Sequence, residues 1–171
     1  RSFGRRTRGA PPGRLLCTIA AMAPAPRRVA HYEVVAPLAR GGFGEVFEAR
    51  DLRTGEAVAL KVVATAAPEA AARFAREAHI ATSLRHPNVV AVLAHGRLDH
   101  GASWLAMERL RGCDLRARLA RGRLSPRDAA AVGLGACEGL AHAHARGVVH
   151  RDVKPGNIFR CDGDPGRVKV L

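Results

Sequence analysis

The chain has 171 residues, of which 47% are hydrophobic, so it can bury one core, either as a single domain or as part of a larger one. Its formal charge of +13 is uneven, because residues 1–31 contain seven arginines and no acidic residue. The remainder is moderately basic and aromatic residues make up only 4% of the chain, which argues against nucleic-acid binding as the main activity.

The cysteines and the apolar segments exclude further classes of protein. The four cysteines are far apart and form no CxxC pair, which argues against a disulfide or zinc framework: Cys17, Cys113, Cys137 and Cys161. Free thiols are typical of a reducing cytosol, so we expect a cytoplasmic protein. No apolar run approaches the roughly 20 residues that a membrane helix requires.

Residues 1–31 are predicted to be a disordered basic extension, because they are rich in proline and arginine and show no consistent hydrophobic period. Met22 opens a plausible natural start, so we expect residues 1–21 to lie upstream of it. No function is assigned to this extension.

From Tyr32 the pattern predicts a folded region. Residues 32–40 and 45–50 are predicted strands on either side of a glycine turn at 40–44. That turn alone is a weak indicator of function, because many hairpins contain glycine. A third strand, 58–63, carries Lys61, one of only three lysines in a chain that otherwise uses arginine. A compact ammonium group at such a position suits phosphate binding.

Pro68 to Leu84 is predicted to form a helix. At 100° per residue, five positions fall within one arc that we expect to be buried: Ala70, Phe74, Glu77, Ala81 and Leu84. A buried carboxylate requires a cationic partner, and Lys61 is the natural candidate for Glu77. The alternative is a glutamate at the exposed edge of the helix.

The rest of the chain is predicted to alternate between short strands and helices. Strands are expected at 89–94, 103–108, 158–160 and 167–171, a connector at 109–113, and a short helix at 114–120. A longer helix is expected from Ser125 to Arg146, with Ser125 as N-cap, Pro126 in the first turn and Gly147 after its end. The predicted fold class is α+β: a five-stranded antiparallel lobe (32–108) with one helix, then the first part of a helical lobe (109–171).

The eight residues His150–Asn157 form the most specific motif. An aspartate followed two residues later by lysine and five residues later by asparagine is rarely a simple turn. Together with the glycine turn and Lys61, this loop indicates phosphoryl transfer from a nucleotide.

The order of these motifs closely resembles the signature set of protein kinases, and the Arg-Asp-x-Lys-Pro run resembles the bacterial-type (Hanks-type) serine/threonine branch. The resemblance implies that Asp152 accepts the proton of the attacking hydroxyl and that Asn157 holds Mg²⁺. It implies that Lys154 offsets charge on the transferred phosphate, and that Lys61, held by Glu77, contacts the phosphates of ATP.

The resemblance also implies a set of nucleotide contacts. Met107 matches the gatekeeper, Glu108 and Leu110 match the hinge, and Asp114 matches the ribose contact. The glycine loop and the apolar positions around adenine complete the set: Ala39, Gly41, Gly44, Val46, Ala59 and Phe159.

The chain departs from the family pattern at two places. Ala39 replaces the first glycine of the loop, from which we expect reduced loop freedom and weaker ATP binding. Residues 167–171 resemble the strand that leads into the Asp-Phe-Gly motif, so we expect the chain to be truncated just before it. A chain ending there is expected to be inactive alone and marginally folded, with one side of the 125–146 helix bare.

The predicted function is therefore phosphorylation of serine or threonine in proteins, with ATP and Mg²⁺ as cofactors. The alternatives are a pseudokinase or truncated nucleotide-binding module, and a nucleic-acid binder that depends on residues 1–31. The histidines His142, His144 and His150 lack zinc-site spacing. The arginine-rich run 111–123 is predicted to be a solvated face, or a site that helps to dock acidic partners.

Overall fold

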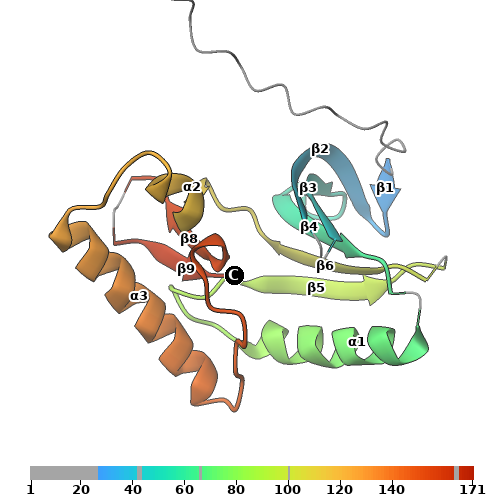
Figure 1. The fold of residues 1–171 in the computed structure, drawn as a ribbon. Coiled ribbons are helices and arrows are strands. Elements are labelled where there is room, and N and C mark those ends of the chain that lie inside the picture. Colours follow the sequence, from blue (N-terminus) through green and yellow to red (C-terminus); the bar gives the residue numbers. More distant parts are fainter. Residues whose placement is uncertain (1–26, 42–43, 66, 100, 164–165) are drawn as a thin grey trace, which may run out of the picture.

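The computed structural model describes residues 27–41, 44–65, 67–99, 101–163 and 166–171, and Figure 1 shows their arrangement. The predictions made for residues 1–26, and for the middle of the glycine turn at 42–43, lie outside these described residues.

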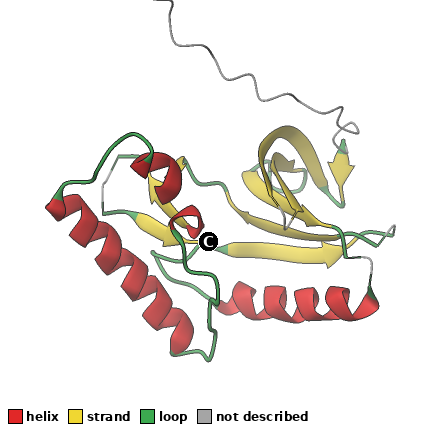
Figure 2. Cartoon of the chain, in the orientation of Figure 1, coloured by secondary structure: helices red, strands yellow, loops and turns green. Residues whose placement is uncertain are grey.

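A six-stranded antiparallel sheet with the strand order β1-β2-β3-β4-β6-β5 forms the larger part of the fold. Figure 2 shows this sheet on one side of the molecule, with a helix running beneath it. Its elements are β1 (Arg28–Val29), β2 (Tyr32–Gly41), β3 (Gly44–Asp51), β4 (Ala57–Val63), α1 (Pro68–Ser83), β5 (Val92–Arg97) and β6 (Ser103–Glu108).

The five predicted strands of this lobe are all present, with two corrections at their edges. The folded region begins earlier than predicted, because Val29 in β1 is fully buried beside Tyr32. Residues 28–29 therefore belong to the folded region and not to the expected disordered extension. Strand β5 begins three residues later than predicted, because Val90 instead donates its backbone N–H to the Val170 carbonyl (2.9 Å).

The core of this lobe lies on one face of the sheet, where alternate strand residues point inward. Leu60 and Ala106 are completely buried there, and Trp104 packs edge-on against Tyr32 with ring centroids 5.4 Å apart. Lys61 follows Leu60 in β4, so the two side chains point to opposite faces of the sheet. Because Leu60 is in the core, Lys61 projects from the other face.

A second, three-stranded sheet has the order β7-β8-β9 and is flanked by two helices. Its elements are β7 (Gly112–Asp114), α2 (Leu115–Leu119), α3 (Pro126–His144), the short 3-10 helix η1 (Pro155–Asn157), β8 (Ile158–Cys161) and β9 (Val168–Val170). The predicted connector at 109–113 is thus partly a strand, because Gly112 to Asp114 pair with β8. Leu115, Val132 and Val168 form its small core.

Helix α3 confirms its predicted start, since the Ser125 side chain accepts a hydrogen bond from the Asp128 backbone N–H (3.1 Å). One side of α3 lies against β9 and the segment around Asn88. Gly139 permits this approach, because a Cβ there would stand 2.5 Å from the Asn88 carbonyl oxygen. The other side is open, and Leu134 is 63% exposed.

Of the helices in the described part of the chain, none combines the length and the apolar character required to cross a bilayer.

Candidate active site

The loop that follows α3 gathers three of the predicted site residues around one carboxylate. The Lys154 ammonium lies 2.6 Å from Oδ2 of Asp152. The Asn157 side-chain amide donates to the same oxygen (3.0 Å) and to the Asp152 backbone carbonyl (2.8 Å). Both bonds are made by the side-chain nitrogen of Asn157. Its side-chain oxygen accepts no hydrogen bond from the described residues and can bind a ligand.

These contacts hold the pKa of Asp152 below its ordinary value. The hydrogen bond from Lys154 is the largest cause, and the Asn157 hydrogen bond and the nearby positive charges act in the same direction against a smaller desolvation effect. Asp152 is therefore an ionised acceptor at neutral pH. Its side chain is 51% exposed and accessible to an incoming group.

His150 anchors the start of this loop to the end of β9. The Asp152 backbone N–H donates to Nδ1 of His150 (3.2 Å), so the proton of the ring is on Nε2, which donates to the Leu171 carbonyl (2.8 Å). Arg151 between them has a φ of 64°, a left-handed conformation that is costly for a residue with a long side chain. The hydrogen bonds on both sides of Arg151 hold this turn in place.

Four predicted nucleotide residues lie on one face of the large sheet. In the strand register, Val46 pairs with Lys61, and Ala59 pairs with Met107. Directly paired residues share a face, and so do residues two apart in one strand. These four side chains therefore all project from the face opposite Leu60 and the core.

The predicted pairing of Lys61 with Glu77 is wrong in this structure. Glu77 is exposed on α1, and no ion pair within 4.0 Å involves either side chain in the described residues. The buried residues of α1 are Ala71 and Ala78, so the centre of the inward stripe is rotated by about 90° from that of the predicted one. The carboxylate lies at the exposed edge of the helix, which was the alternative interpretation.

Lys61 itself is half-buried, and desolvation lowers the pKa of its ammonium. A desolvated cation without a carboxylate partner gains strongly from an anionic ligand.

The described ends of the glycine turn are in close contact with β4. Gly41 pairs with Gly44, whose φ is 116° and at which a Cβ would stand 2.2 Å from the Val62 carbonyl. A side chain is excluded at Gly44 on both grounds. Ala39 pairs with Val46 and is exposed, and its φ is not positive, so alanine is tolerated there without strain.

The predicted hinge connects β6 to β7. The Glu108 backbone N–H is already bonded to the Ala91 carbonyl (3.0 Å), and the Arg109 side chain is bonded to the Leu110 carbonyl. The Leu110 backbone N–H has no acceptor within the described part of the chain, so it is free to contact a ligand.

Asp114 and Phe159 are directly opposite each other in the β7–β8 pair. Asp114 caps α2 by accepting a hydrogen bond from the Ala117 backbone N–H (2.7 Å). One of its carboxylate oxygens thus has a structural partner, and the residue is the N-cap of the helix that was predicted to begin with it.

Two residues that link the sheets were missed at the sequence level. The Lys169 ammonium lies 2.7 Å from Oε1 of Glu108, an oxygen that also accepts from the Ala91 N–H (2.7 Å). Asn88 donates from its side chain to the Val168 carbonyl (2.9 Å). Lys169 is 7% exposed and is the third of the three lysines, so its rarity was a usable indicator.

The loop thus offers an exposed, ionised carboxylate with an ammonium and an amide beside it, and β4 offers a separate, desolvated ammonium. No group of three or more histidine, cysteine or acidic residues that could hold a metal ion occurs in the described ranges.

Known proteins resemble the chain over most of its described length. The family described as "Protein kinase domain" matches residues 32–171. A probable serine/threonine-protein kinase of Corynebacterium efficiens is 40% identical over 147 residues, which are 82% of this chain and 22% of that protein. The serine/threonine-protein kinase PknD of Mycobacterium tuberculosis is 40% identical over 137 residues, 78% of this chain and 20% of that protein.

Solved structures give the same result for the fold. The kinase domain of PknI from Mycobacterium tuberculosis superimposes with a TM-score of 0.74 and 31% identity, over 82% of this chain and 57% of that domain. The chain spans about a fifth of the length of the curated relatives that it matches.

Proposed function

The chain belongs to the protein kinase family, among its bacterial serine/threonine members, and from this premise we propose that it carries the nucleotide site and catalytic loop of a kinase acting on serine or threonine in proteins. The proposed lobes are residues 28–108 and 109–171. The cytoplasm is the proposed location, in keeping with the free cysteines at positions 113, 137 and 161.

The observation that carries the proposal is the contact set of Asp152. Its carboxylate is exposed and ionised, and its geometry is fixed by Lys154 and Asn157 (2.6 and 3.0 Å). A carboxylate held in this way can accept a hydrogen bond from a substrate hydroxyl and orient its oxygen for attack. The proton of the hydroxyl passes to an Asp152 oxygen as the hydroxyl oxygen bonds to the γ-phosphorus of ATP, the bond from that phosphorus to the bridging oxygen breaks, and ADP leaves.

The two lysines have separate proposed roles. Lys61 lies on the sheet face with Val46, Ala59 and Met107, where it can bind phosphate oxygens beneath the glycine turn. Lys154 is beside the proton acceptor, so its ammonium is positioned to offset charge on the transferred phosphoryl group. Glu77 is proposed to bind Lys61 only if α1 rotates, because it is exposed in this structure.

The remaining proposed contacts bind the base and sugar of ATP. Leu110 offers its backbone N–H and Glu108 its backbone carbonyl to the adenine edge, with Met107 as gatekeeper. Asp114 is proposed to contact the ribose with its uncommitted oxygen, and Phe159 to cover one face of the base. Ala39, Gly41 and Gly44 are proposed to lie over the phosphates.

The residues present fit a magnesium ion that is held jointly with the nucleotide. Mg²⁺ usually binds proteins through one or two oxygen ligands and completes its shell with phosphates and water. Asn157 offers a side-chain oxygen that accepts no hydrogen bond from the described residues, while its amide nitrogen is bonded to Asp152. When bound, Mg²⁺ supplies charge compensation for the phosphates.

The direct test measures transfer of the γ-phosphate from labelled ATP to serine- and threonine-containing proteins by the full chain, followed by phosphoamino-acid analysis. Asp152→Asn is expected to lower the transfer rate about 100-fold or more and to leave ATP affinity within about twofold. Asp99→Asn, which changes an exposed aspartate in the β5–β6 turn, is the matched control.

The outcomes separate the proposal from its alternative. Labelled phosphoserine or phosphothreonine that depends on Asp152 supports a kinase. ATP binding by the wild-type chain with no transfer to any acceptor supports the nucleotide-binding module, and is also the outcome expected if the chain is inactive alone. Equal transfer by the wild type and Asp152→Asn would contradict the assigned role of the carboxylate.

A further inference from the structure

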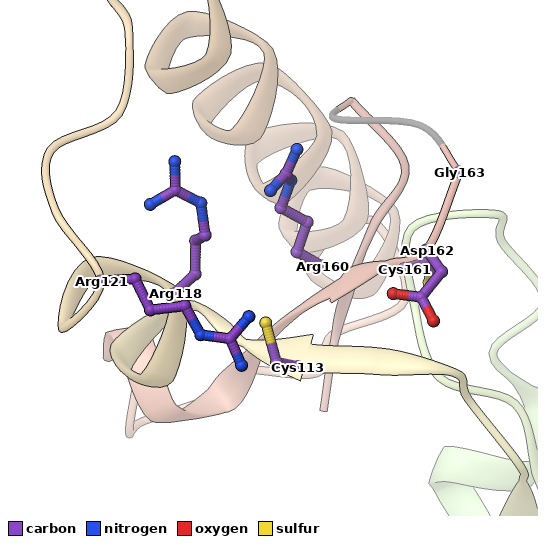
Figure 3. Close-up of a pocket in the computed structure, with 7 residues that line it drawn as sticks. All are labelled: Cys113, Arg118, Arg121, Arg160, Cys161, Asp162 and Gly163. Atoms are coloured by element: carbon purple, nitrogen blue, oxygen red, sulfur yellow. The ribbon is translucent and has the colours of Figure 1, made fainter. Parts of the chain in front are cut away.

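A pocket rich in arginine lies between α2 and the β7–β8 pair, outside the candidate active site. It has a volume of about 410 Å³ and is lined by residues that include Arg118, Arg121 and Arg160. Figure 3 shows these three side chains grouped with Cys113 at one end of the pocket and Asp162 at the other. Pockets of this size hold small ligands or a side chain of a partner.

The strand register separates this pocket from the proposed nucleotide contacts. Cys113 pairs with Arg160, and Asp114 pairs with Phe159 one position along the same two strands. Neighbouring positions in a strand point to opposite faces. Arg160 therefore projects from the face of the β7–β8 pair opposite to the proposed adenine and ribose residues.

The positive charge in the pocket forms no ion pair within the described part of the chain. None of the three arginines forms an ion pair with a carboxylate among the described residues, although Asp162 lines the same pocket. Arg118 donates to a neutral acceptor, the Gly122 carbonyl (3.1 Å), and to no carboxylate among the described residues. Burial raises the pKa of the Cys161 thiol in the lining, so this thiol supplies no negative charge at neutral pH.

Arg160 provides the most direct indication of a ligand. Its Nε is buried and has no hydrogen-bond partner in the described part of the chain. A buried donor without an acceptor is costly, and more so when it carries charge. An anion bound to the guanidinium groups would offset the cost of this buried charge and reduce the repulsion among the three arginines.

The sequence around the pocket strengthens this charge bias. Six arginines and a single acidic residue lie between positions 111 and 127. Guanidinium groups bind phosphate oxygens in a bidentate manner, and a phosphate monoester offers about two negative charges and three acceptor oxygens. A carboxylate offers one charge and two oxygens, and so compensates three arginines less completely.

We propose that this pocket binds a phosphate monoester dianion through Arg118, Arg121 and Arg160. The ligand is either a phosphorylated side chain of a polypeptide or free phosphate, and both present the same chemical group. The site does not depend on ATP or on the proposed catalytic residues.

The test measures binding to the full chain at fixed ionic strength, without ATP or Mg²⁺. The probes are a fluorescent neutral peptide with one phosphoserine, the same peptide without phosphate, and inorganic phosphate as competitor. We expect the phosphopeptide to bind at least about tenfold more tightly than its unmodified form. Arg160→Met and Arg121→Met are each expected to weaken binding about tenfold, which corresponds to about 1.4 kcal/mol.

Arg127→Met is the matched control, because it removes one exposed positive charge at the start of α3 outside the pocket lining. Its affinity for the phosphopeptide is expected to stay within about twofold of the wild type. Arg121 is also exposed, so its substitution keeps the test valid if Arg160→Met fails to fold.

Two results would overturn the proposal: equal affinity for the phosphorylated and unmodified peptides, or equal losses from Arg127→Met and the pocket variants. Competition by inorganic phosphate at the same concentration as the phosphopeptide supports the site and assigns it to the free anion. Much weaker competition by inorganic phosphate also supports the site, and identifies its ligand as a phosphorylated polypeptide.

Discussion

The loop from His150 to Asn157 and the β4–α1 pair hold the charged groups of the candidate site in different ways. In the loop, Asp152 is bound to Lys154 and Asn157, which lie two and five residues further along the chain. On β4, Lys61 is half-buried and forms no ion pair with any described carboxylate, and Glu77 is exposed on α1. Both regions were predicted from the same family signature.

The difference is that contacts within one loop form locally, whereas a contact between a strand and a helix depends on how the two elements pack. The contacts of Asp152 are made by side chains of the same loop, whose start His150 connects to Leu171. A Lys61–Glu77 contact requires α1 to present a chosen face to the sheet. The surface that α1 buries, with Ala71 and Ala78 inward, decides that orientation.

The largest expected effect comes from the core behind Lys61. Leu60 is completely buried, so Leu60→Ala is expected to lower the free energy of unfolding by about 2–5 kcal/mol. Leu134→Ala, on the open side of α3, is expected to change it by less than about 0.5 kcal/mol. Urea denaturation measures both, and similar losses would show that the open side of α3 is covered in solution.

A smaller loss of folding stability is expected where α3 packs against Asn88. A Cβ at Gly139 would stand 2.5 Å from the Asn88 carbonyl, so Gly139→Ala is expected to cost about 1–3 kcal/mol of folding stability. Gly133→Ala in the same helix has open space and is expected to stabilise by up to about 1 kcal/mol. Thermal unfolding compares the two, and a neutral Gly139→Ala would place α3 further from Asn88.

Measurements of nucleotide affinity test the roles of Lys61 on β4 and Glu77 on α1. Lys61→Met is expected to weaken binding of a fluorescent ATP analogue about tenfold, about 1.4 kcal/mol, because the desolvated ammonium lacks a carboxylate and binds phosphate. Glu77→Gln is expected to weaken it less than about threefold, because Glu77 is exposed and unpaired. Equal losses would show that the pair forms when nucleotide binds.

The smallest expected effect is a pKa shift in the loop. Lys154→Met removes the largest cause that lowers the pKa of Asp152, so this pKa is expected to rise toward its ordinary value of 3.8. Asn157→Ala is expected to raise it less. Because the pKa is depressed in the folded protein, any stabilisation from Asp152 is present above pH 3.8 and is lost as the pH falls through the folded value.

Carbon-13 NMR of the Asp152 carboxyl group measures this titration. A lack of any pKa change in Lys154→Met would mean that the Lys154 contact does not persist in solution.

Much of the fold could be predicted from the sequence alone, because the relevant contacts are local. The strand Ser103–Glu108 and the Ser125 cap of α3 follow from residue spacing, and the loop that contains Asp152, Lys154 and Asn157 was recognised from its motif. Turns, caps and short loops satisfy their hydrogen bonds within a few residues, so their sequence contains most of the information.

Only the tertiary structure decided how these elements face one another. It rotated the buried stripe of α1 so that Glu77 is exposed, and it used Lys169 to join β9 to Glu108. It also brought Arg160 of β8 next to Arg118 and Arg121, which are about 40 residues away in the chain. The periodicity of the sequence predicts that a helix has an apolar face. The surface on which the helix packs decides which of its residues are buried.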